Sequence, residues 1–257
     1  MIAILSSAKT MDFETPGPTL QPTLPECLEQ ACVMMKRLST LSANDISKLM
    51  GVSPKIAQLN ADRFKRFSFT HTPRNAKPAL LAYQGAVYQA IESRSFGLKE
   101  LKFAQKRLRI ISGLYGVLRP LDLIQPYRLE MAIKMPGPTW KDLYGYWSNQ
   151  VTACIDRDAM ANGRVIVNLA SQEYSRVLEA GKIKARVLDV IFKQDRKGKV
   201  AVVPILAKFA RGLMANYIVT RQITEPEGLK RFQAEGYRFI PADSTASEWA
   251  FIRRASE

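Results

Sequence analysis

The sequence predicts a mixed α/β protein of the α+β class, in which a mixed sheet is surrounded by helices within a single compact domain, residues 1–257. Short apolar runs of strand length alternate with longer segments whose apolar residues recur at helical spacing. The composition, 47% hydrophobic and 24% charged residues, is that of a globular chain. No repeat or flexible linker in the sequence divides these segments into separate domains.

The expected elements follow one another along the chain. Residues 1–5 are a continuous apolar run and predict a buried strand, and the proline-rich residues 16–25 predict an extended connector. In residues 185–205, two apolar runs flank Asp195-Arg196-Lys197-Gly198, whose glycine suits a hairpin turn. Further strands are expected at 109–112, 164–171, 237–240 and 248–254, and helices at 25–38, 79–93, 98–108 and 205–222.

The charge of the chain is unusual in size and in distribution. There are 38 Lys and Arg against 23 Asp and Glu, which gives a net charge of +15. Residues 36–74 hold eight basic and two acidic residues, and residues 176–211 hold ten basic and three acidic residues. Such patches predict a polyanionic partner, with nucleic acid the main candidate against a protein that is merely basic.

Three cysteines and one histidine limit the available chemistry. Cys27, Cys32 and Cys154 give no disulfide framework, and His71 stands far in sequence from any cysteine, so no metal-ligand cluster is evident. The N-terminus lacks a basic region before its apolar run, and no apolar run reaches membrane-spanning length. We therefore expect a cytoplasmic protein with no metal, no cofactor and no membrane partner, and the oligomeric state stays open.

Residues 42–64 predict two short helices joined by a tight turn. Ser42 is expected to cap the first helix, with Asp45 at the capping-box position, and Gly51 is expected to end it. Ser53 is then expected to cap the second helix, with Pro54 at its first position.

This pair resembles a helix-hairpin-helix motif, in which backbone N–H groups bind a phosphate at the N-terminus of the second helix. Ser53 stands where that motif usually has a second glycine, and the alternative is a corner that only packs two helices. The expected phosphate-binding residues are Gly51, Val52, Ser53, Lys55, Arg63, Lys65 and Arg66.

Charged and polar side chains also occur in the loops that follow the predicted strands. The apolar stretch 113–131, stiffened by Pro120 and Pro126, carries four of them. Because strand ends in an α/β sheet converge on a crevice, we expect one cationic cleft, whereas the alternative is a buried salt-bridge network that fixes the fold. The expected cleft residues are Lys9, Arg119, Asp122, Arg128, Glu130, Asn168, Ser171, Glu173, Tyr174, Lys193, Lys208 and Arg211.

Four stretches carry a resemblance to a known family: "SGLYGVLRPLDLIQPYRLEM" (112–131), "NLASQEY" (168–174), "AKFARGLM" (207–214) and "EGYRF" (235–239). Over the whole chain the sequence resembles the YaaA family of bacterial peroxide-stress proteins. Ser7 replaces the proline of that family's Ser-Pro-Ala-Lys-Thr, and Ala86 replaces the acid of its Gly-Asp-Val-Tyr. The resemblance implies a cytoplasmic DNA-binding protein, with a helix-hairpin-helix element and a basic cleft, that limits damage from free iron under peroxide stress.

Two functions are therefore kept. The first is binding of DNA through its phosphate backbone, without sequence preference, by a peroxide-stress protein whose effect on iron is indirect. The alternative is an enzyme that acts on a nucleotide or another phosphate-containing substrate in the same cleft, with Glu130 or Glu173 as acid or base. The sequence shows no Cys-His pair, Ser-His-Asp triad or P-loop, so we prefer the first and leave catalysis open.

Overall fold

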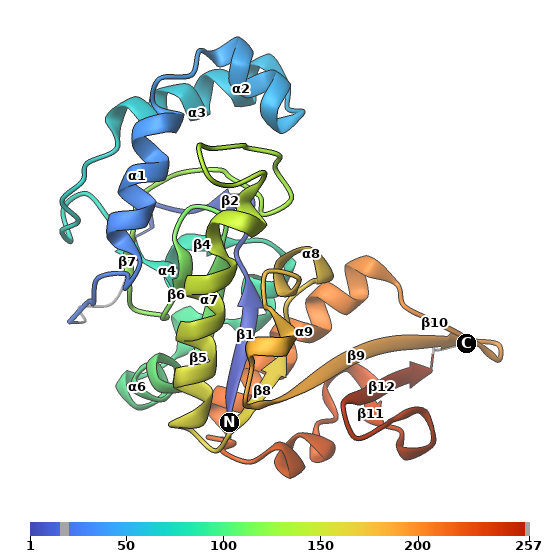
Figure 1. Ribbon diagram of the computed structural model, residues 1–257. Helices are drawn as coiled ribbons and strands as arrows, with labels where there is room; N and C mark the ends of the chain where they lie inside the picture. The colour runs from blue at the N-terminus through green and yellow to red at the C-terminus, as the bar shows by residue number, and fades with distance from the viewer. Residues whose placement is uncertain (16–20, 255–257) are drawn as a thin grey trace.

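The computed structural model describes residues 1–15 and 21–254 (Figure 1), so part of the predicted connector, 16–20, lies outside the described residues. An eight-stranded mixed sheet forms the centre of the molecule, in the order β11-β12-β9-β8-β1-β5-β6, with β10 paired to β9. This architecture confirms the predicted fold class. The strands of this sheet are β1 Ile2–Ser6, β5 Leu108–Ser112, β6 Gly116–Leu118, β8 Val165–Asn168, β9 Arg186–Arg196, β10 Lys199–Ala201, β11 Arg238–Phe239 and β12 Glu248–Arg254.

The chain changes direction across the sheet at β1. The strands β5, β1, β8, β9 and β12 run parallel, and β1 lies between β5 and β8. After β1 the chain reaches β5 on one side, and it then crosses to β8 on the other side. In open α/β sheets such a switch leaves a crevice outside the carboxyl ends of the strands, where ligands usually bind. The loops after β1 and β8 are therefore the first place to examine for a site.

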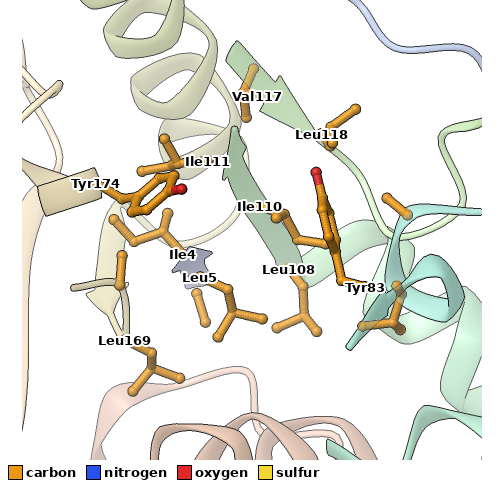
Figure 2. Close-up of a cluster of buried hydrophobic side chains, with 14 of the residues drawn as sticks. Ile4, Leu5, Tyr83, Leu108, Ile110, Ile111, Val117, Leu118, Leu169 and Tyr174 are labelled. Carbon is orange, nitrogen blue, oxygen red and sulfur yellow. The ribbon is translucent and has the colours of Figure 1, made fainter. Parts of the chain in front are cut away.

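Helices cover both faces of the sheet. The long helix α7 packs against β8 and β6, and the helices α6 and α9 pack against the strands from the opposite side (Figures 1 and 2). A further layer, made by α1, α2 and α3, lies beyond one end of the sheet (Figure 1). The α-helices are α1 Leu28–Leu38, α2 Ala43–Met50, α3 Pro54–Arg66, α4 Ala79–Ala82, α5 Ala86–Ile91, α6 Leu98–Arg107, α7 Leu143–Met160, α8 Gln172–Ser175 and α9 Pro204–Thr220.

Short elements complete the chain. Two small antiparallel pairs stand apart from the main sheet: β2 Thr10–Met11 with β4 Tyr83–Gln84, and β3 Lys77–Pro78 with β7 Leu123–Ile124. The 3₁₀ turns are η1 Ser93–Ser95, η2 Ala180–Lys182, η3 Pro226–Arg231, η4 Ala234–Gly236 and η5 Pro241–Asp243.

Two of the expected elements differ from the prediction, and the long helix α7 was not predicted. The helix expected over 79–93 is broken into α4, β4 and α5, because Tyr83 and Gln84 pair with β2 and Gly85 adopts a φ of +114°. The strand expected over 164–171 ends at Asn168, where the chain turns into a loop. The hairpin expected over 185–205 is present as β9 and β10, with Lys197 and Gly198 both at positive φ.

The core is centred on β1 and β5 (Figure 2). Ile4, Leu5, Leu108 and Ile110 have no exposed surface. Fully burying one such side chain stabilises the fold by about 1.5–3 kcal/mol. The loops that follow these two strands are thus held by strands whose apolar side chains are buried.

One glycine allows an unusually close helix contact. A Cβ atom at Gly212 on α9 would lie 2.1 Å from the carbonyl oxygen of Val87 on α5. Only glycine can occupy this position without moving one helix away from the other. The contact brings the N-terminal half of α9 next to the segment that contains Gly85 and Ala86.

No helix in the described part of the chain combines the length and the apolar character needed to cross a bilayer.

Candidate functional site

The helical pair at residues 42–66 has the local geometry that its sequence predicts. Ser42 and Asp45 form the capping box of α2, and Gly51 ends that helix in the left-handed region at φ +60°. Pro54 occupies the first position of α3 as predicted, but the side chain of Ser53 accepts no capping hydrogen bond, so the cap expected there is wrong. The amide of Val52 donates to the carbonyl oxygen of Ser47, so part of the turn's hydrogen-bonding capacity is used internally. The unpaired N–H groups at the start of α3 remain available.

The basic residues around this pair are not neutralised. In the ranges that the structure describes, none of the eight Lys and Arg side chains of residues 36–74 forms an ion pair with a carboxylate. The two acids of the segment are engaged elsewhere, since Asp45 caps α2 and Asp62 accepts from Gln58. We call these eight residues the basic helical surface: Lys36, Arg37, Lys48, Lys55, Arg63, Lys65, Arg66 and Arg74.

A groove of about 1060 Å³ runs between α3 and the segment after β1. Arg63 and Arg66 line it from α3, whereas Lys65, between them in sequence, does not. Asp12 lies on the other side and pairs with Arg94 and Lys77. Hydrogen bonds from Thr15 hold the pKa of Asp12 well below its usual range. Arg63 and Arg66 are thus the basic residues through which the helical surface reaches the groove.

A smaller cavity of about 240 Å³ lies at the carboxyl ends of β1 and β8, where the chain changes direction across the sheet. We call it the switch-point cavity. Thr10, Gln84 and Gly85 line both the cavity and the groove, so the two adjoin. The polar residues of the cavity include Ser6, Ser7, Lys9, Ser171, Glu173, Tyr174, Lys208 and Arg211.

The hydroxyl groups of the cavity are held by the strand ends. The amide of Ser171 donates to Ser6 Oγ at 2.9 Å, and the two serine Oγ atoms are 3.2 Å apart. Tyr88 donates its phenol to the carbonyl oxygen of Ser6 at 2.8 Å. Burial raises the pKa of Tyr174, so its phenol stays protonated at neutral pH and can donate a hydrogen bond.

An ion-paired carboxylate stands next to the cavity. Glu130 Oε1 is 3.2 Å from Lys9 Nζ and 2.8 Å from a terminal nitrogen of Arg128. Glu130 Oε2 is buried and has no hydrogen-bond partner among the residues that the structure describes. Burial alone would raise the pKa of Glu130, but the hydrogen bonds and charges of Arg128 and Lys9 outweigh it and lower the pKa. Glu130 is therefore ionised at neutral pH, with one oxygen still able to accept.

The two cations contributed by α9 have no such partner. Within the described residues, neither Lys208 nor Arg211 forms an ion pair with a carboxylate. Lys208 is exposed, whereas Arg211 is half-buried, and burial lowers its pKa. An unpaired guanidinium in a partly desolvated position is unfavourable unless an anion accompanies it.

Six of the expected cleft residues line one cavity: Lys9, Ser171, Glu173, Tyr174, Lys208 and Arg211. Arg128 and Glu130 join them through Lys9. Asn168 is not among the residues that line the cavity; its amide donates to Asp189 at 2.7 Å and its oxygen accepts from the amide of Ala170. Sequence reasoning did not select Ser6 or Ser7, although both belong to the same "SSAKT" loop as Lys9.

The structure places the remaining three expected cleft residues elsewhere. Lys193 lies on β9 opposite Ile252, outside the residues that line the cavity. Arg119 and Asp122 pair with each other in the loop after β6, at 2.9 Å. Asp122 is 1% exposed and also accepts from Thr23 Oγ1 at 2.6 Å, so this pair fixes a loop.

In the described ranges, no group of three or more His, Cys, Asp or Glu side chains is placed to hold a metal ion. His71 is buried, and its ring nitrogens lie 3.0 Å from the Tyr115 hydroxyl and 3.2 Å from the Gln125 amide. Burial lowers the pKa of His71 to about 4, so the ring is neutral at physiological pH.

Fold and site together define a class: a mixed α/β protein with a cationic cavity at the carboxyl ends of parallel strands and an adjoining basic helical layer. The chain belongs to the family described as peroxide stress protein YaaA, which matches residues 1–243. It is also 42% identical, over 261 residues and the full length of both chains, to UPF0246 protein Reut_A1014 of Cupriavidus pinatubonensis. The family resemblance seen in the sequence is thus confirmed.

Proposed function

We propose that this member of a peroxide-stress family binds DNA without sequence preference, through the basic helical surface and the groove beside it. The observation that carries the proposal is the set of eight basic side chains in residues 36–74 that form no ion pair within the described part of the chain. Cations without partners neutralise phosphates at the smallest cost, because no internal pair has to be broken first. The helical pair adds the N-terminus of α3, where backbone N–H groups and the helix dipole favour a phosphate.

The first test is the salt dependence of binding to a duplex of arbitrary sequence, measured by fluorescence anisotropy. The dissociation constant should be about 10⁻⁴ to 10⁻⁶ M at physiological salt and should rise steeply with salt concentration. Undetectable binding at low salt, or an affinity that is flat between low and moderate salt, would contradict the proposal.

A matched pair of variants tests where the DNA lies. Lys55 and Lys99 are both exposed and both occupy the second position of a helix, α3 and α6 respectively. An acid at that position favours either helix, so Lys55→Glu and Lys99→Glu should both fold. Only Lys55→Glu should weaken DNA binding by about tenfold, because it sets a negative charge against the phosphate. Equal affinities of the two variants would reduce the helical pair to a packing corner.

For the cell, we propose that DNA binding limits oxidative, iron-dependent damage. DNA covered by a protein is less accessible to radicals formed by iron and peroxide. The protein can therefore limit iron-dependent damage without binding iron itself. A strain that lacks this protein should regain peroxide survival with the wild-type chain and with Lys99→Glu, but only partly with Lys55→Glu at equal protein level. Full rescue by Lys55→Glu would separate protection from DNA binding.

A second candidate function is an enzyme that acts on a nucleotide or another phosphate-containing substrate. The observation that favours it is Glu173, a carboxylate inside a cavity that also holds Lys9, Lys208 and Arg211. Release of inorganic phosphate from a panel of nucleotides, lost in Glu173→Gln, would support this candidate.

A further inference from the structure

The switch-point cavity has more positive charge than its own acids can neutralise. Lys9, Lys208 and Arg211 line it together with one acid, Glu173. The neighbouring pair of Arg128 and Glu130 adds one charge of each sign. These four basic and two acidic side chains leave an excess of two positive charges. A phosphomonoester carries close to two negative charges at neutral pH, whereas a phosphodiester within a strand carries only one.

The donors of the cavity suit such a group. Arg211 offers a planar set of N–H donors that matches phosphate oxygens, and its half-buried position has no carboxylate partner in the described chain. Lys208 lies three residues earlier on α9, on the same helical face. The close contact of Gly212 with Val87 fixes this part of α9 over the cavity. The helix backbone that carries both donors is therefore positioned before a ligand arrives.

The dimensions indicate how much of a ligand enters. Pockets that enclose a whole small molecule measure about 300–1,000 Å³. The cavity, at about 240 Å³, is smaller, but it adjoins the groove of about 1060 Å³. Arg63 and Arg66 of the basic helical surface line that groove. A ligand whose terminal phosphate sits in the cavity could therefore continue along the groove toward α3.

We propose that the switch-point cavity binds a phosphomonoester dianion, carried either by the end of a DNA strand that lies in the groove or by a free nucleotide. The strand-end form rests on the DNA binding proposed above. It also has a chemical link to peroxide stress, because oxidative destruction of one deoxyribose leaves phosphate groups on the two neighbouring nucleotides. In the strand-end form, the protein recognises broken strands in addition to covering intact duplex.

The experiment compares oligonucleotide duplexes that differ only at a strand end: 5′-phosphate, 3′-phosphate or hydroxyl. Affinities measured at one salt concentration should favour a phosphorylated end by at least about tenfold, the contribution of one charge-assisted hydrogen bond. A parallel arm measures binding of nucleoside 5′-monophosphate and nucleoside 3′-monophosphate by calorimetry, against the unphosphorylated nucleoside. Preference for phosphate in the duplex arm identifies the strand end as the source, and preference in the nucleotide arm alone identifies the free nucleotide.

Variants then locate the preference. Arg211→Met should remove most of the preference for a phosphorylated end. Arg221→Met, at the C-terminal end of α9, should leave this preference intact, because Arg221 lines neither the switch-point cavity nor the groove. Lys208→Met, at an exposed position, repeats the test without risk to folding, and Arg211→Lys should restore part of the preference. Lys55→Glu should weaken binding to all duplexes equally and leave the ratio between phosphorylated and hydroxyl ends unchanged.

Two results would overturn the inference. One is an equal affinity for phosphorylated and hydroxyl ends together with no binding of either monophosphate, which leaves the proposed DNA binding intact. The other is a phosphate preference that Arg211→Met and Lys208→Met do not alter, which would place the phosphate outside the cavity. Failure of all duplexes to bind while a monophosphate binds would instead refute the proposed DNA binding and support the cavity as a nucleotide site.

Discussion

Two arginine–carboxylate pairs lie nine residues apart in the same stiff segment, and they differ in how completely their carboxylates are satisfied. Asp122 accepts from the backbone amide and side chain of Arg119 and from the hydroxyl of Thr23. Glu130 shares one oxygen between Arg128 and Lys9 and leaves its other oxygen without a partner. Similar sequence patterns have thus produced one closed ion pair and one open ion pair.

The difference separates structural charges from charges available to a ligand. Burial raises the pKa of the Asp122 carboxyl and outweighs the hydrogen bonds from Arg119 and Thr23, which lower it. The two cations beside Glu130 outweigh its burial and lower its pKa. One of these cations, Lys9, also lines the switch-point cavity. The closed pair holds the loop. The open pair still offers a ligand one acceptor, Glu130 Oε2, and one cation that faces the cavity, Lys9.

The largest expected effect comes from opening the closed pair. Arg119→Met would leave the carboxylate of Asp122, which is 1% exposed, without its cation. Removing one partner of a buried pair costs about 3–5 kcal/mol, and because the Arg119 side chain is 36% exposed, the free energy of unfolding in urea should fall by about 3 kcal/mol, the lower end of that range. A loss below about 1 kcal/mol would show that the two pairs are equivalent and would remove the basis of the comparison.

The same substitution in the open pair should have a much smaller effect on stability. In Arg128→Met the carboxylate of Glu130 keeps Lys9 at 3.2 Å, so we expect the free energy of unfolding to fall by only about 1 kcal/mol. Protection of a peroxide-challenged deletion strain should nevertheless fall at equal protein level. If Arg128→Met lowers both the free energy of unfolding and the peroxide protection by large amounts, the open pair also serves to stabilise the loop.

A double-mutant cycle measures whether Lys9 and Arg128 act on the same carboxylate. Lys9→Met and Arg128→Met together leave Glu130 without either cation, so their combined cost should exceed the sum of the single costs by about 0.5–1 kcal/mol. Lys9→Met and Arg119→Met share no partner and should be additive. Additive behaviour of the first pair would mean that Lys9 and Arg128 do not act on the same carboxylate.

The smallest expected effect is on the pH dependence of stability in the acid range. The lowered pKa of Glu130 means that the unfolded chain binds more protons just below pH 4.5, so this group loses its stabilising effect as pH falls. The raised pKa of Asp122 has the opposite sign, because just above pH 3.8 the folded chain binds more protons. Urea unfolding between pH 3.5 and 5 should therefore show a flatter slope in Glu130→Gln and a steeper slope in Asp122→Asn. Equal slopes would contradict the distinction.

Local features of the fold were predictable because their causes are local. The two helices at 42–66 follow from Ser42, Asp45, Gly51 and Pro54, which act within one or two turns. The break at Tyr83 and Gln84 was not predictable, since it depends on pairing with a strand more than seventy residues earlier. The long helix α7 had a usable signal that the prediction did not exploit: buried residues recur every four positions at Leu143, Trp147, Val151 and Ile155.

The candidate site was partly predictable for a different reason. Carboxyl ends of parallel strands share one edge of a sheet, so Lys9 and Ser171 could be expected to lie close together. Arg119 failed this reasoning because it follows β6, which runs antiparallel and returns the chain to the opposite edge. Lys193 failed it because β9 continues past the end of β8, beyond the register pair Asn168–Asp189. The direction and the length of a strand determine whether a polar residue on it or after it reaches the cavity, and a short sequence motif indicates neither.

The central position of β1 also sets an order of events in folding. β1 pairs Ala3 with Leu108 and Ile2 with Ile166, so the sheet requires closure of very long loops, which is slow. The helical pair α2–α3 requires only contacts between sequence neighbours, which form far sooner. On a ribosome that adds about 5–20 residues per second, α3 is complete several seconds before β8 exists. We therefore expect the nascent chain to display its basic surface first and to acquire its cavity last.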